Sequence, residues 1–574
     1  MKSLLKYLKN YKKETILAPL FKMLEAGFDL LVPLVVASII DQGIKRGDST
    51  HILKMGGVLI LLAVVGLAVA LTAQFFAAKA AAGFGTELRH DLFKHIQSLS
   101  YAQLDRQGTS TLITRMTTDV NQVQAQVNMS IRLLLRSPFI VFGAMIMAFM
   151  VDVKAAMVFV VAIPALSVIV YGIMILTIPM YKKVQKGLDQ IMMSTRDNLA
   201  GVRVIRAFNK QDAEKNRYAE ENYFLYKIQM LAGRISTLMN PATYVIVNAA
   251  VIWILWIGGE RVDTGALSQG QVVALVNYMS QILVELIKLA ALIINIIKAL
   301  ACASRIEEVF QLEPGMVEGT IQEPESNTEY IVEMEHASIA YNESGEESLS
   351  DVNLKVRPGE MIGIIGGTGS GKSTLVQLIS RFYDVTSGSV KIHGVNVKDY
   401  TYEALRKMIS IVPQKALLFK GTIRSNMEWG KKGASDDEII DALKISQSYE
   451  FVMEKENTVD AVVEQNGKNF SGGQRQRLTI ARAVVAKPDI LILDDSSSAL
   501  DYVTDLKLRQ ALRNLKNMTT FVVSQRTASI MDADHIVVLD DGQVMGIGTH
   551  EELLKNCETY QEIYASQNKN EEGR

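Results

Sequence analysis

Cysteine and net charge are what this sequence of 574 residues has least of. Its two cysteines, Cys302 and Cys557, lie far apart and lack the spacing of metal ligands, so the sequence predicts neither a disulfide framework nor a zinc site. The 60 Lys and Arg residues are balanced by 61 Asp and Glu residues, which leaves no basic excess that would favour nucleic acid as a partner. Basic character therefore has to be judged locally.

Hydrophobic residues are abundant by contrast. They make up 49% of the chain, and the mean hydropathy of +0.16 is higher than a soluble protein would have. Five lysines in residues 1–13 predict a helix at the membrane surface, and the apolar stretch after them is too long for the core of a signal peptide. Six apolar stretches are near or above the roughly 20 residues that a bilayer requires: residues 15–40, 55–84, 130–151, 155–179, 238–258 and 272–301.

The connections between these stretches place the chain in the membrane. Residues 87–128 and 181–234 are long, helical in pattern and rich in Lys and Arg, whereas residues 152–154 and 259–270 are short. Because basic connections stay inside, the two long ones are expected to project into the cytoplasm, together with both termini. The first domain, residues 1–306, is thus predicted to be a multi-pass domain of the plasma membrane with six spans.

A composition change marks the end of this domain. Residues 307–330 lose apolar density and contain two prolines and two glycines, which predicts a linker. In residues 331–574, short β-rich runs at 409–413, 490–493, 519–524 and 535–539 alternate with helical segments. That alternation is typical of an α/β domain with a largely parallel central sheet.

One stretch of the soluble domain carries specific chemistry. Residues 366–374 read GGTGSGKST and fit the phosphate-binding pattern G-x-x-x-x-G-K-[ST], between a predicted strand and a helical run. In such a loop, backbone N–H groups surround a phosphate, Lys372 reaches the β- and γ-phosphates and Ser373 ligates Mg²⁺. The expected fold is therefore an α-helical six-span transmembrane domain with long cytoplasmic helices, followed by an α/β P-loop nucleotide-binding domain. The candidate ligands in the loop are Gly366, Gly369, Ser370, Gly371, Lys372, Ser373 and Thr374.

Two further motifs carry a resemblance to a known family. Residues 469–477 read NFSGGQRQR and look like the signature motif of ATP-binding-cassette (ABC) proteins, and residues 491–495, LILDD, resemble their second nucleotide motif. With six preceding spans, the whole chain resembles one half of a type IV ABC exporter. It is most similar to the degenerate-site subunit of bacterial heterodimeric multidrug exporters.

The resemblance implies ATP and Mg²⁺ as cofactors and assigns roles around them. Tyr341 matches an aromatic residue that stacks on adenine, although a buried core tyrosine is the alternative. Gln414 matches a glutamine that senses Mg²⁺, and Asp494 ends a strand where a carboxylate holds this ion. The residues implied to hold the metal are Ser373, Gln414 and Asp494.

The signature motif implies a partner. In the family, a helix that begins at this motif holds the γ-phosphate of ATP bound on the opposite subunit, so dimerisation completes each site. The residues with this implied role are Ser471, Gly472, Gly473 and Gln474. A coupling role is implied for two segments of the long connections, residues 109–118 and 201–209, which resemble short helices that dock on nucleotide-binding domains.

Two positions depart from the family pattern at the chemistry. A Glu normally polarises the attacking water, and this chain has Asp495, which is one methylene shorter. A His normally contacts the γ-phosphate, and this chain has Gln525, which cannot carry a proton or positive charge. Together these departures predict a site that binds ATP and hydrolyses it poorly, with productive hydrolysis at the site of a partner.

Ionisable residues within the spans form two pairs. Glu25 and Asp29 are four positions apart in the first span, and Glu285 and Lys288 are three apart in the sixth, so each pair shares a helix face. A charge in the bilayer is costly unless it is paired or faces water. The pairs are therefore interpreted either as lining a substrate pathway or as neutralising one another.

The predicted function is ATP-driven export of small amphipathic or hydrophobic compounds across the lipid bilayer, by a heterodimer of two half-transporters. A dedicated lipid or peptide exporter fits the same architecture. An ATP-gated channel or regulatory subunit is a further alternative, because a slow site would suit it as well.

Overall fold

The computed structural model describes residues 3–324, 328–341, 345–515 and 517–568. It divides into two compact units. The membrane unit consists of Met1–Gln97 and Gly108–Leu312, and the nucleotide-binding unit consists of Ser98–Gln107 and Glu313–Arg574. A short piece of the first long connection thus belongs with the C-terminal part of the chain.

Six helical stretches of the membrane unit are long and apolar enough to cross a bilayer, which confirms the predicted spans within the described residues. The first contains η1 (Leu4–Tyr11), α1 (Lys12–Ser38) and η2 (Ile39–Ile44), and the second is α2 (Ser49–Ser98). The third contains α4 (Thr109–Thr114), η3 (Arg115–Asp119), α5 (Val120–Leu133) and α6 (Arg136–Val151). The others are α7 (Val153–Ala200), α9 (Gln211–Thr237) with α10 (Met239–Asp263), and α11 (Gln269–Phe310), and α8 (Val202–Ala207) links α7 to α9.

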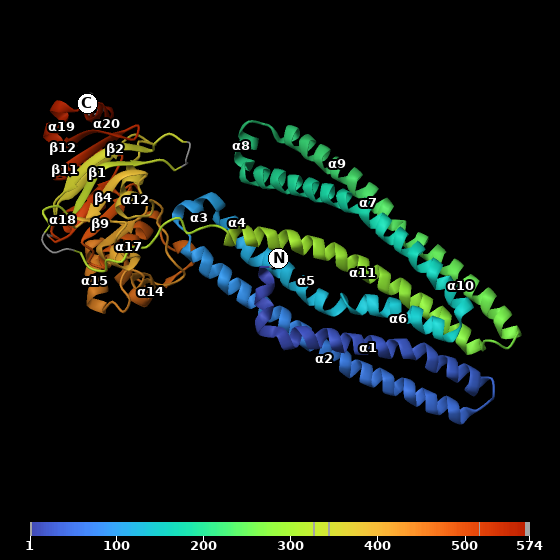
Figure 1. The fold of residues 1–574 in the computed structure, drawn as a ribbon. Coiled ribbons are helices and arrows are strands. Elements are labelled where there is room, and N and C mark those ends of the chain that lie inside the picture. The colour runs from blue at the N-terminus through green and yellow to red at the C-terminus, as the bar shows by residue number, and fades with distance from the viewer. Residues whose placement is uncertain (1–2, 325–327, 342–344, 516, 569–574) are drawn as a thin grey trace. The chain divides into compact units, whose positions relative to one another are not determined.

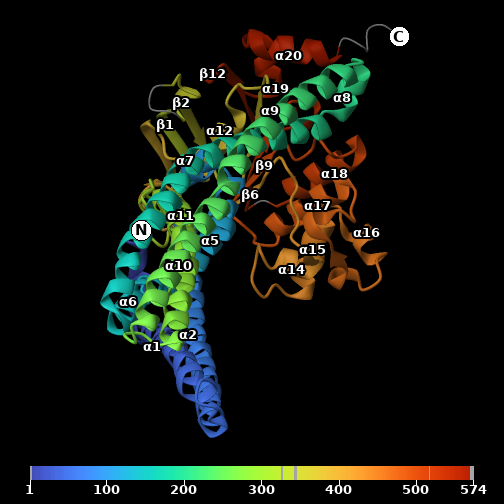
Figure 2. The same ribbon diagram turned by 90° about the vertical axis from the view of Figure 1, so that its right-hand side faces the viewer.

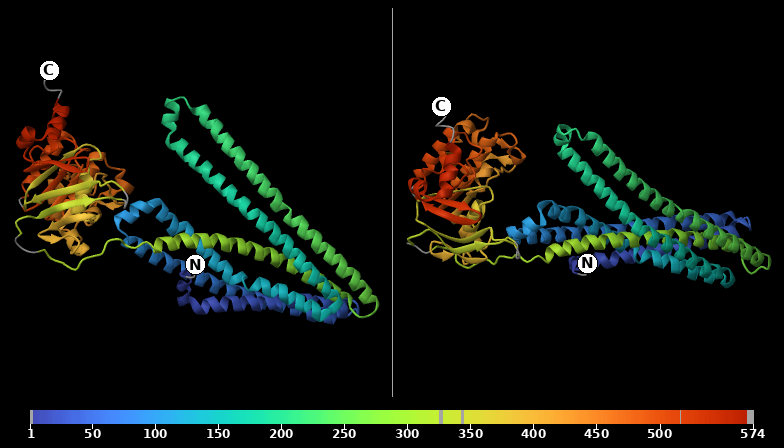
Figure 3. Two further views of the ribbon diagram at one scale, coloured as in Figure 1. Left: turned by 45° about the horizontal axis from the view of Figure 1, so that its top comes forward. Right: turned by 90° about the horizontal axis from the view of Figure 1, so that it is seen from above.

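Helix α11 is the centre of this unit and packs on α1, α5, α6, α7 and α10 (Figure 1). Its residues Leu275, Tyr278 and Ile282 are fully buried, and the Tyr278 hydroxyl donates to the backbone oxygen of Leu30 at 2.7 Å. Helices α7 and α9 lie side by side over much of their length (Figure 3). At 1.5 Å per residue, the 48 residues of α7 extend about 72 Å, far beyond the ~30 Å hydrocarbon core, so this hairpin reaches well outside the membrane.

The nucleotide-binding unit is built on a six-stranded sheet with the order β12-β11-β3-β10-β9-β6. Its strands β12, β9 and β6 are labelled in Figure 2. All neighbours are parallel except β12 and β11, which confirms the predicted largely parallel sheet. Its strands are β3 (Met361–Gly366), β6 (Ile409–Val412), β9 (Ile490–Asp494), β10 (Thr519–Val523), β11 (His535–Asp540) and β12 (Gln543–Gly548). An antiparallel sheet adds β1 (Val332–Ile339), β2 (Leu349–Val356), β4 (Ser387–Ile392) and β5 (Val395–Asn396), and β7 (Gly421–Thr422) pairs with β8 (Val462–Val463).

Helices cover the six-stranded sheet on both faces, so its central strands β3, β9 and β10 are buried throughout. Along β10 the side chains alternate: Phe521 and Val523 face a core shared with α12 (Lys372–Ile379), and Val522 faces a core shared with α17 (Gly472–Val484). The remaining helices are α13 (Tyr402–Met408), α14 (Ile423–Met427), α15 (Asp436–Ile445), α16 (Tyr449–Met453), α18 (Tyr502–Arg513), α19 (His550–Asn556), α20 (Glu558–Asn568), and the short η4 (Thr458–Asp460), η5 (Gln465–Gly467) and η6 (Thr527–Ser529).

Two segment boundaries differ from the sequence-based expectations. Helix α11 continues to Phe310, four residues into the range 307–330 expected to be a linker. The piece of the first long connection that packs on the nucleotide-binding unit is α3 (Tyr101–Gln107), whereas residues 109–118 belong to the membrane unit. The reason is an aromatic contact, because the ring of Tyr101 stacks on Phe382 with centroids 4.4 Å apart.

Arg381 ties the helix after the phosphate loop to the incoming chain. Its side chain is buried and donates to the backbone oxygens of Val317 at 2.6 Å and Tyr400 at 3.4 Å, and to the Asp384 carboxylate at 3.1 Å. The segment that precedes the first sheet strand is therefore held against the end of α12.

We expect Arg381→Ala to destabilise the nucleotide-binding unit. The backbone oxygen of Val317 loses its donor, at a cost of about 1–3 kcal/mol, which lowers a thermal midpoint by roughly 2–4 °C per kcal/mol in a unit of this size. Differential scanning fluorimetry of the purified full-length chain measures this shift. Arg357→Ala is the control, since Arg357 is exposed and makes a single 3.4 Å ion pair with Glu329. Equal midpoints for the two variants would contradict the prediction.

Candidate nucleotide site

The loop between β3 and α12 favours glycine at three positions, and Gly369 is one of them, with a φ of +88°. A Cβ on Gly366 would lie 2.1 Å from the backbone oxygen of Leu539 and 2.5 Å from Ser370 Oγ. Gly371 has a φ of +93°, in the left-handed region that other residues rarely adopt. Because of these constraints, the loop closes tightly between the sheet and the first turn of α12, and its backbone N–H groups can converge on an anion.

Lys372, the first residue of α12, turns back over the loop. Its ammonium donates to the backbone oxygens of Gly367 at 2.5 Å and Gly366 at 3.0 Å, and its side chain is only 9% exposed. Burial lowers the pKa of Lys372, while the nearby Asp495 and Asp494 act in the opposite direction. A phosphate placed beside this ammonium would be a partner of opposite charge.

Asp494 ends β9 and meets the helix that follows the loop. Ser373 Oγ donates to Asp494 Oδ1 at 3.0 Å, and Asp494 is 7% exposed. Burial raises the pKa of Asp494, the hydrogen bond from Ser373 lowers it and the neighbouring Asp495 raises it. A divalent cation would offset the free-energy cost of burying this carboxylate. The oxygens of Asp494 and Ser373, which lie at hydrogen-bond distance from each other, are hard donors of the kind that Mg²⁺ prefers. Gln414 adds an amide nearby, donating to Asp495 Oδ2 at 3.3 Å.

These groups line one cavity of about 340 Å³. It brings together most of the residues expected from sequence to surround nucleotide: Gly369, Gly371, Lys372, Ser373, Thr374, Gln414, Asp494, Asp495 and Gln525. Its ionisable lining comprises four carboxylates, including Glu347 and Asp541, and one ammonium, Lys372. Because the lining is acidic overall, a phosphate would enter more favourably with a cation than alone.

Tyr341 lies at the edge of α12 rather than in the core. It is 45% exposed, which is inconsistent with the alternative of a buried core tyrosine. Its hydroxyl donates to Gln377 Oε1 at 3.2 Å and accepts from the Thr374 hydroxyl at 3.1 Å, and its ring packs edge-on against Tyr383 with centroids 4.9 Å apart. Tyr383 in turn donates to Asp105 on α3 at 2.5 Å. A continuous set of contacts thus joins the helix after the phosphate loop to the connection from the membrane unit.

The signature motif stands apart from this cavity. Ser471 caps α17, because its hydroxyl accepts from the backbone N–H of Gln474 at 3.2 Å and its own N–H donates to Gln474 Oε1 at 3.0 Å. Ser471 and Gly472 are exposed. None of the signature-motif residues 469–477 is among the described residues that line the cavity. The start of α17 is thus available to a ligand that this chain's own loop does not hold.

One residue that positions the site was missed by the sequence analysis. Gln567, on α20, accepts from the backbone N–H of Thr527 at 2.8 Å and from its hydroxyl at 2.9 Å, and donates to the backbone oxygen of Gln525 at 2.7 Å. Gln525 itself is exposed after β10. The C-terminal helix therefore clamps the loop that carries Gln525, and no local pattern around residue 567 indicates this role.

The ionisable residues of the spans meet around a further missed residue, Arg136 on α6. Its guanidinium contacts Glu285 Oε1 at 2.7 Å and Asp29 Oδ2 at 2.9 Å. Glu285 also accepts from Lys288 at 2.9 Å and Ser137 at 2.8 Å, and its side chain is 5% exposed. Glu285 and Lys288 thus neutralise one another, as one of the two interpretations expected, but within a larger network. An arginine inside the apolar stretch 130–151 was the available signal.

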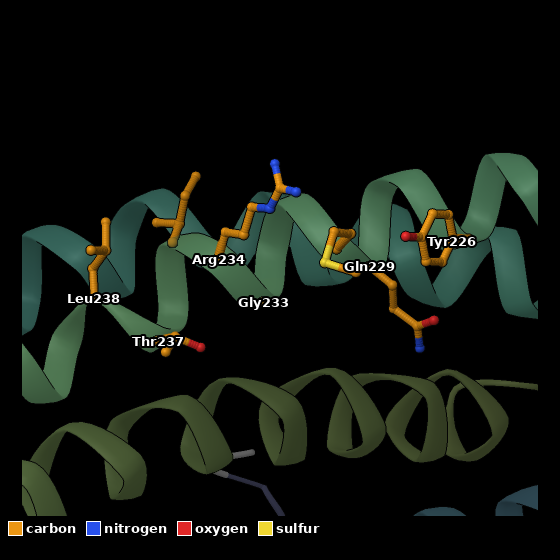
Figure 4. A pocket seen from close by; sticks show the side chains of 8 residues that line it. Tyr226, Gln229, Gly233, Arg234, Thr237 and Leu238 are labelled. Carbon is orange, nitrogen blue, oxygen red and sulfur yellow. The ribbon is translucent and has the colours of Figure 1, made fainter.

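A larger hollow, of about 730 Å³, lies along α9 in the membrane unit (Figure 4). Its lining comes from that helix and its C-terminal end, with Tyr226, Gln229, Arg234 and Leu238 among the side chains. Tyr226 and Leu238 are more than half exposed. Because a single helix and the residue that follows it supply the whole lining, this hollow lacks polar groups that converge from several elements, as they do in the cavity of the nucleotide-binding unit.

Comparisons with known proteins agree with this architecture. Residues 15–286 match the family model described as the ABC transporter transmembrane region, and residues 349–498 match the model described as ABC transporter. The chain is 38% identical to the uncharacterized ABC transporter ATP-binding protein YfiB of Bacillus subtilis, covering 99% of this chain and 98% of that protein.

Two other relatives have names that state a function. The putative multidrug export ATP-binding/permease protein YgaD of Bacillus subtilis is 32% identical, over 99% of this chain and 100% of that protein. The ATP-dependent lipid A-core flippase of Desulfotalea psychrophila is 32% identical, over 84% of each chain. A bacterial Atm1-family ABC exporter with ATP bound has the same fold, with a TM-score of 0.79 at 22% identity, covering 97% of this chain and 98% of that one.

A six-span helical unit joined to a P-loop unit defines an ABC exporter, a multi-pass membrane protein that couples ATP to transport. The chain belongs to the ABC transporter family.

We expect Gln567→Ala to loosen the loop that carries Gln525. Losing one net hydrogen bond costs about 1 kcal/mol, so amide exchange at Thr527 should become about 5-fold faster or more. Hydrogen-exchange mass spectrometry of the full-length chain measures it. Gln561→Ala is the matched control on the same helix, since Gln561 donates to Leu554 instead. Unchanged protection of Thr527 in Gln567→Ala would show that the clamp is not formed in solution.

Proposed function

We propose that this chain is one half of a heterodimeric exporter that moves amphipathic or hydrophobic compounds outward across the plasma membrane, with both termini and the nucleotide-binding unit in the cytoplasm. The observation that carries the proposal is the composition of the cavity: it collects this chain's phosphate loop, Asp494, Asp495 and Gln525, but leaves out this chain's own signature motif. A second subunit is needed to complete it.

ATP with Mg²⁺ suits this cavity. Backbone N–H groups of the loop and Lys372 would hold the phosphates, and Tyr341 would stack on adenine. Ser373, Asp494 and Gln414 would hold Mg²⁺, directly or through water, and the ion would neutralise the developing charge on the phosphates. The residues assigned to nucleotide in this proposal are Tyr341, Gly366, Gly369, Ser370, Gly371, Lys372, Ser373, Thr374 and Gln414.

The same cavity is poorly equipped to hydrolyse ATP. Asp495 has a positive φ of 45°. Its short side chain is directed at the amide of Gln414, from which the carboxylate accepts a hydrogen bond. A base displaced by about 1 Å can lose on the order of 10²-fold in rate. Gln525 cannot act as an acid or carry a positive charge toward the γ-phosphate. Two deficits in one site favour slow hydrolysis there.

Exposed groups support a partner subunit. Ser471, Gly472, Gly473 and Gln474 begin a 13-residue helix whose N-terminus favours an anion, and the proposal assigns that anion to ATP held by the partner. At the tip of the α7–α9 hairpin, Leu199, Val204 and Phe208 are 60–72% exposed although the tip lies beyond the membrane. Apolar side chains of that kind are buried most readily by another protein chain.

Closure of the two nucleotide-binding units around ATP would drive transport. The contacts from Tyr341 through Tyr383 to Asp105 offer one route by which a nucleotide that moves Tyr341 would move α3. Two relatives are named as a putative multidrug exporter and a lipid A-core flippase, and these names support the proposal that the substrates are amphipathic.

The first test of the proposal uses this chain without a partner. Because both copies of a homodimer would carry Asp495 and Gln525, we expect the purified chain in lipid vesicles to hydrolyse ATP very slowly, on the order of 10²-fold below a complete exporter. Steady-state phosphate release measures the rate. Fast hydrolysis that disappears in Lys372→Ala would rule out the requirement for a partner.

The second test separates the two sites of the heterodimer. Ser471→Ala should lower ATP turnover by about 10²–10³-fold, since removing one donor to a transferring phosphate has this effect in other enzymes. Asp495→Ala should keep most of the turnover, because the partner's base acts at the other site. Asp495→Glu should add little, since Gln525 is unchanged. Phosphate release by the three variant heterodimers decides the matter, and equal damage from Ser471→Ala and Asp495→Ala would contradict the asymmetric mechanism.

A further inference from the structure

A second built cavity lies within the membrane unit, between α1, α6 and α11. It has a volume of about 570 Å³ and lies entirely within one chain. Four of its lining residues are ionisable: Asp29, Arg136, Glu285 and Lys288. The uncharged lining is apolar at Val32, Pro33, Val36, Ile140 and Val284 and polar at Asn277, Ser280 and Gln281. The cavity thus combines a charged part with an apolar part, within helices that cross the bilayer.

The charged residues form one continuous chain of contacts. Asp29 contacts Arg136 at 2.9 Å, Arg136 contacts Glu285 at 2.7 Å, and Glu285 contacts Lys288 at 2.9 Å. Beyond Arg136, Glu25 lies 3.9 Å away and pairs with Lys22 at 2.5 Å. Three acidic and three basic side chains therefore alternate with no net charge, which lowers the cost of placing them in a membrane.

Exposure differs along this chain of contacts. The central side chains are nearly covered, at 12% for Arg136 and 5% for Glu285. The terminal ones are open to the cavity, at 46% for Asp29 and 43% for Lys288. A ligand in the cavity therefore meets a carboxylate at one end and an ammonium at the other, while the covered pair holds both of them in place.

We propose that this cavity binds the headgroup of a zwitterionic amphiphile, whose cationic group pairs with Asp29 and whose anionic group pairs with Lys288. The assignment deepens the proposed function by naming a substrate class, and rests on it for the direction of transport. A purely cationic ligand would give the exposed Lys288 no partner besides Glu285, and a purely anionic one would give the exposed Asp29 no partner besides Arg136. The apolar side chains would contact the alkyl chain next to the headgroup.

Binding to the full-length chain in maltoside micelles tests this assignment without nucleotide or partner. The probes share a dodecyl chain and differ in headgroup: dodecylphosphocholine, dodecyltrimethylammonium and dodecyl phosphate. Phosphocholine without the chain is a fourth probe. Native mass spectrometry gives the affinities. The wild type should bind dodecylphosphocholine about 10-fold or more tightly than the other three probes, the range expected for one added charge-assisted hydrogen bond.

Variants assign each end. Asp29→Asn should lower the affinity for dodecylphosphocholine about 10-fold and bring it level with that for dodecyl phosphate. Lys288→Gln should make the affinity for dodecylphosphocholine equal to the affinity for dodecyltrimethylammonium. Lys288→Arg should retain the preference for dodecylphosphocholine, because it keeps the positive charge, and this result would show that the cavity is intact. Glu260→Gln, an exposed acid of α10 outside this cavity, is the control and should change nothing.

Equal binding of the three dodecyl probes by the wild type would overturn the assignment, as would an unchanged preference in Asp29→Asn and Lys288→Gln. Binding of phosphocholine as tightly as dodecylphosphocholine would indicate a soluble ligand and would also overturn it. Fast ATP hydrolysis by the chain alone would contradict the heterodimer but leave these affinities untouched, so the two proposals fail separately.

Discussion

Both units of this protein bury charged side chains, and each buried charge has to be stabilised by a partner. In the nucleotide-binding unit, Lys372 and Asp494 are each less than a tenth exposed, and their partners within the chain are two backbone oxygens and the hydroxyls of Ser370 and Ser373. Buried charges of this kind are stabilised by pairing or by a metal ion. A nucleotide that brings both phosphate and Mg²⁺ would satisfy the two residues together, which explains why they lie in one cavity.

The parallel sheet makes this arrangement possible. Since β3, β9 and β10 are neighbours with a common direction, their carboxyl ends meet at one edge, and the phosphate loop, Asp494 and the loop with Gln525 all follow those ends. The helix that begins at Ser471 starts elsewhere and does not reach the cavity of its own chain. The fold thus separates two halves of a nucleotide site, and the proposed heterodimer reunites them.

In the membrane unit the same constraint is met without a ligand. Arg136 lies between Asp29 and Glu285, so the charges balance before anything binds, and the two end groups, Asp29 and Lys288, are the most exposed of the four ionisable residues that line the cavity. Because α11 contributes Glu285 and Lys288 and packs on five other helices, movement of α11 would alter this network directly. The proposed substrate site is therefore placed on the helix that has the most neighbours in its unit.

The six spans, the parallel sheet and the phosphate loop could be predicted from the sequence, because each depends on local composition or on residues adjacent in the chain. The sequence also identified Asp495 and Gln525 as departures from the family pattern, although their effect on hydrolysis stays a prediction. Three contacts became evident only from the packing of the elements: Arg136 joins Glu285 across 149 positions, Gln567 holds Thr527, and α3 packs with the nucleotide-binding unit. Contacts between distant positions depend on how whole helices pack, and no local pattern encodes that packing.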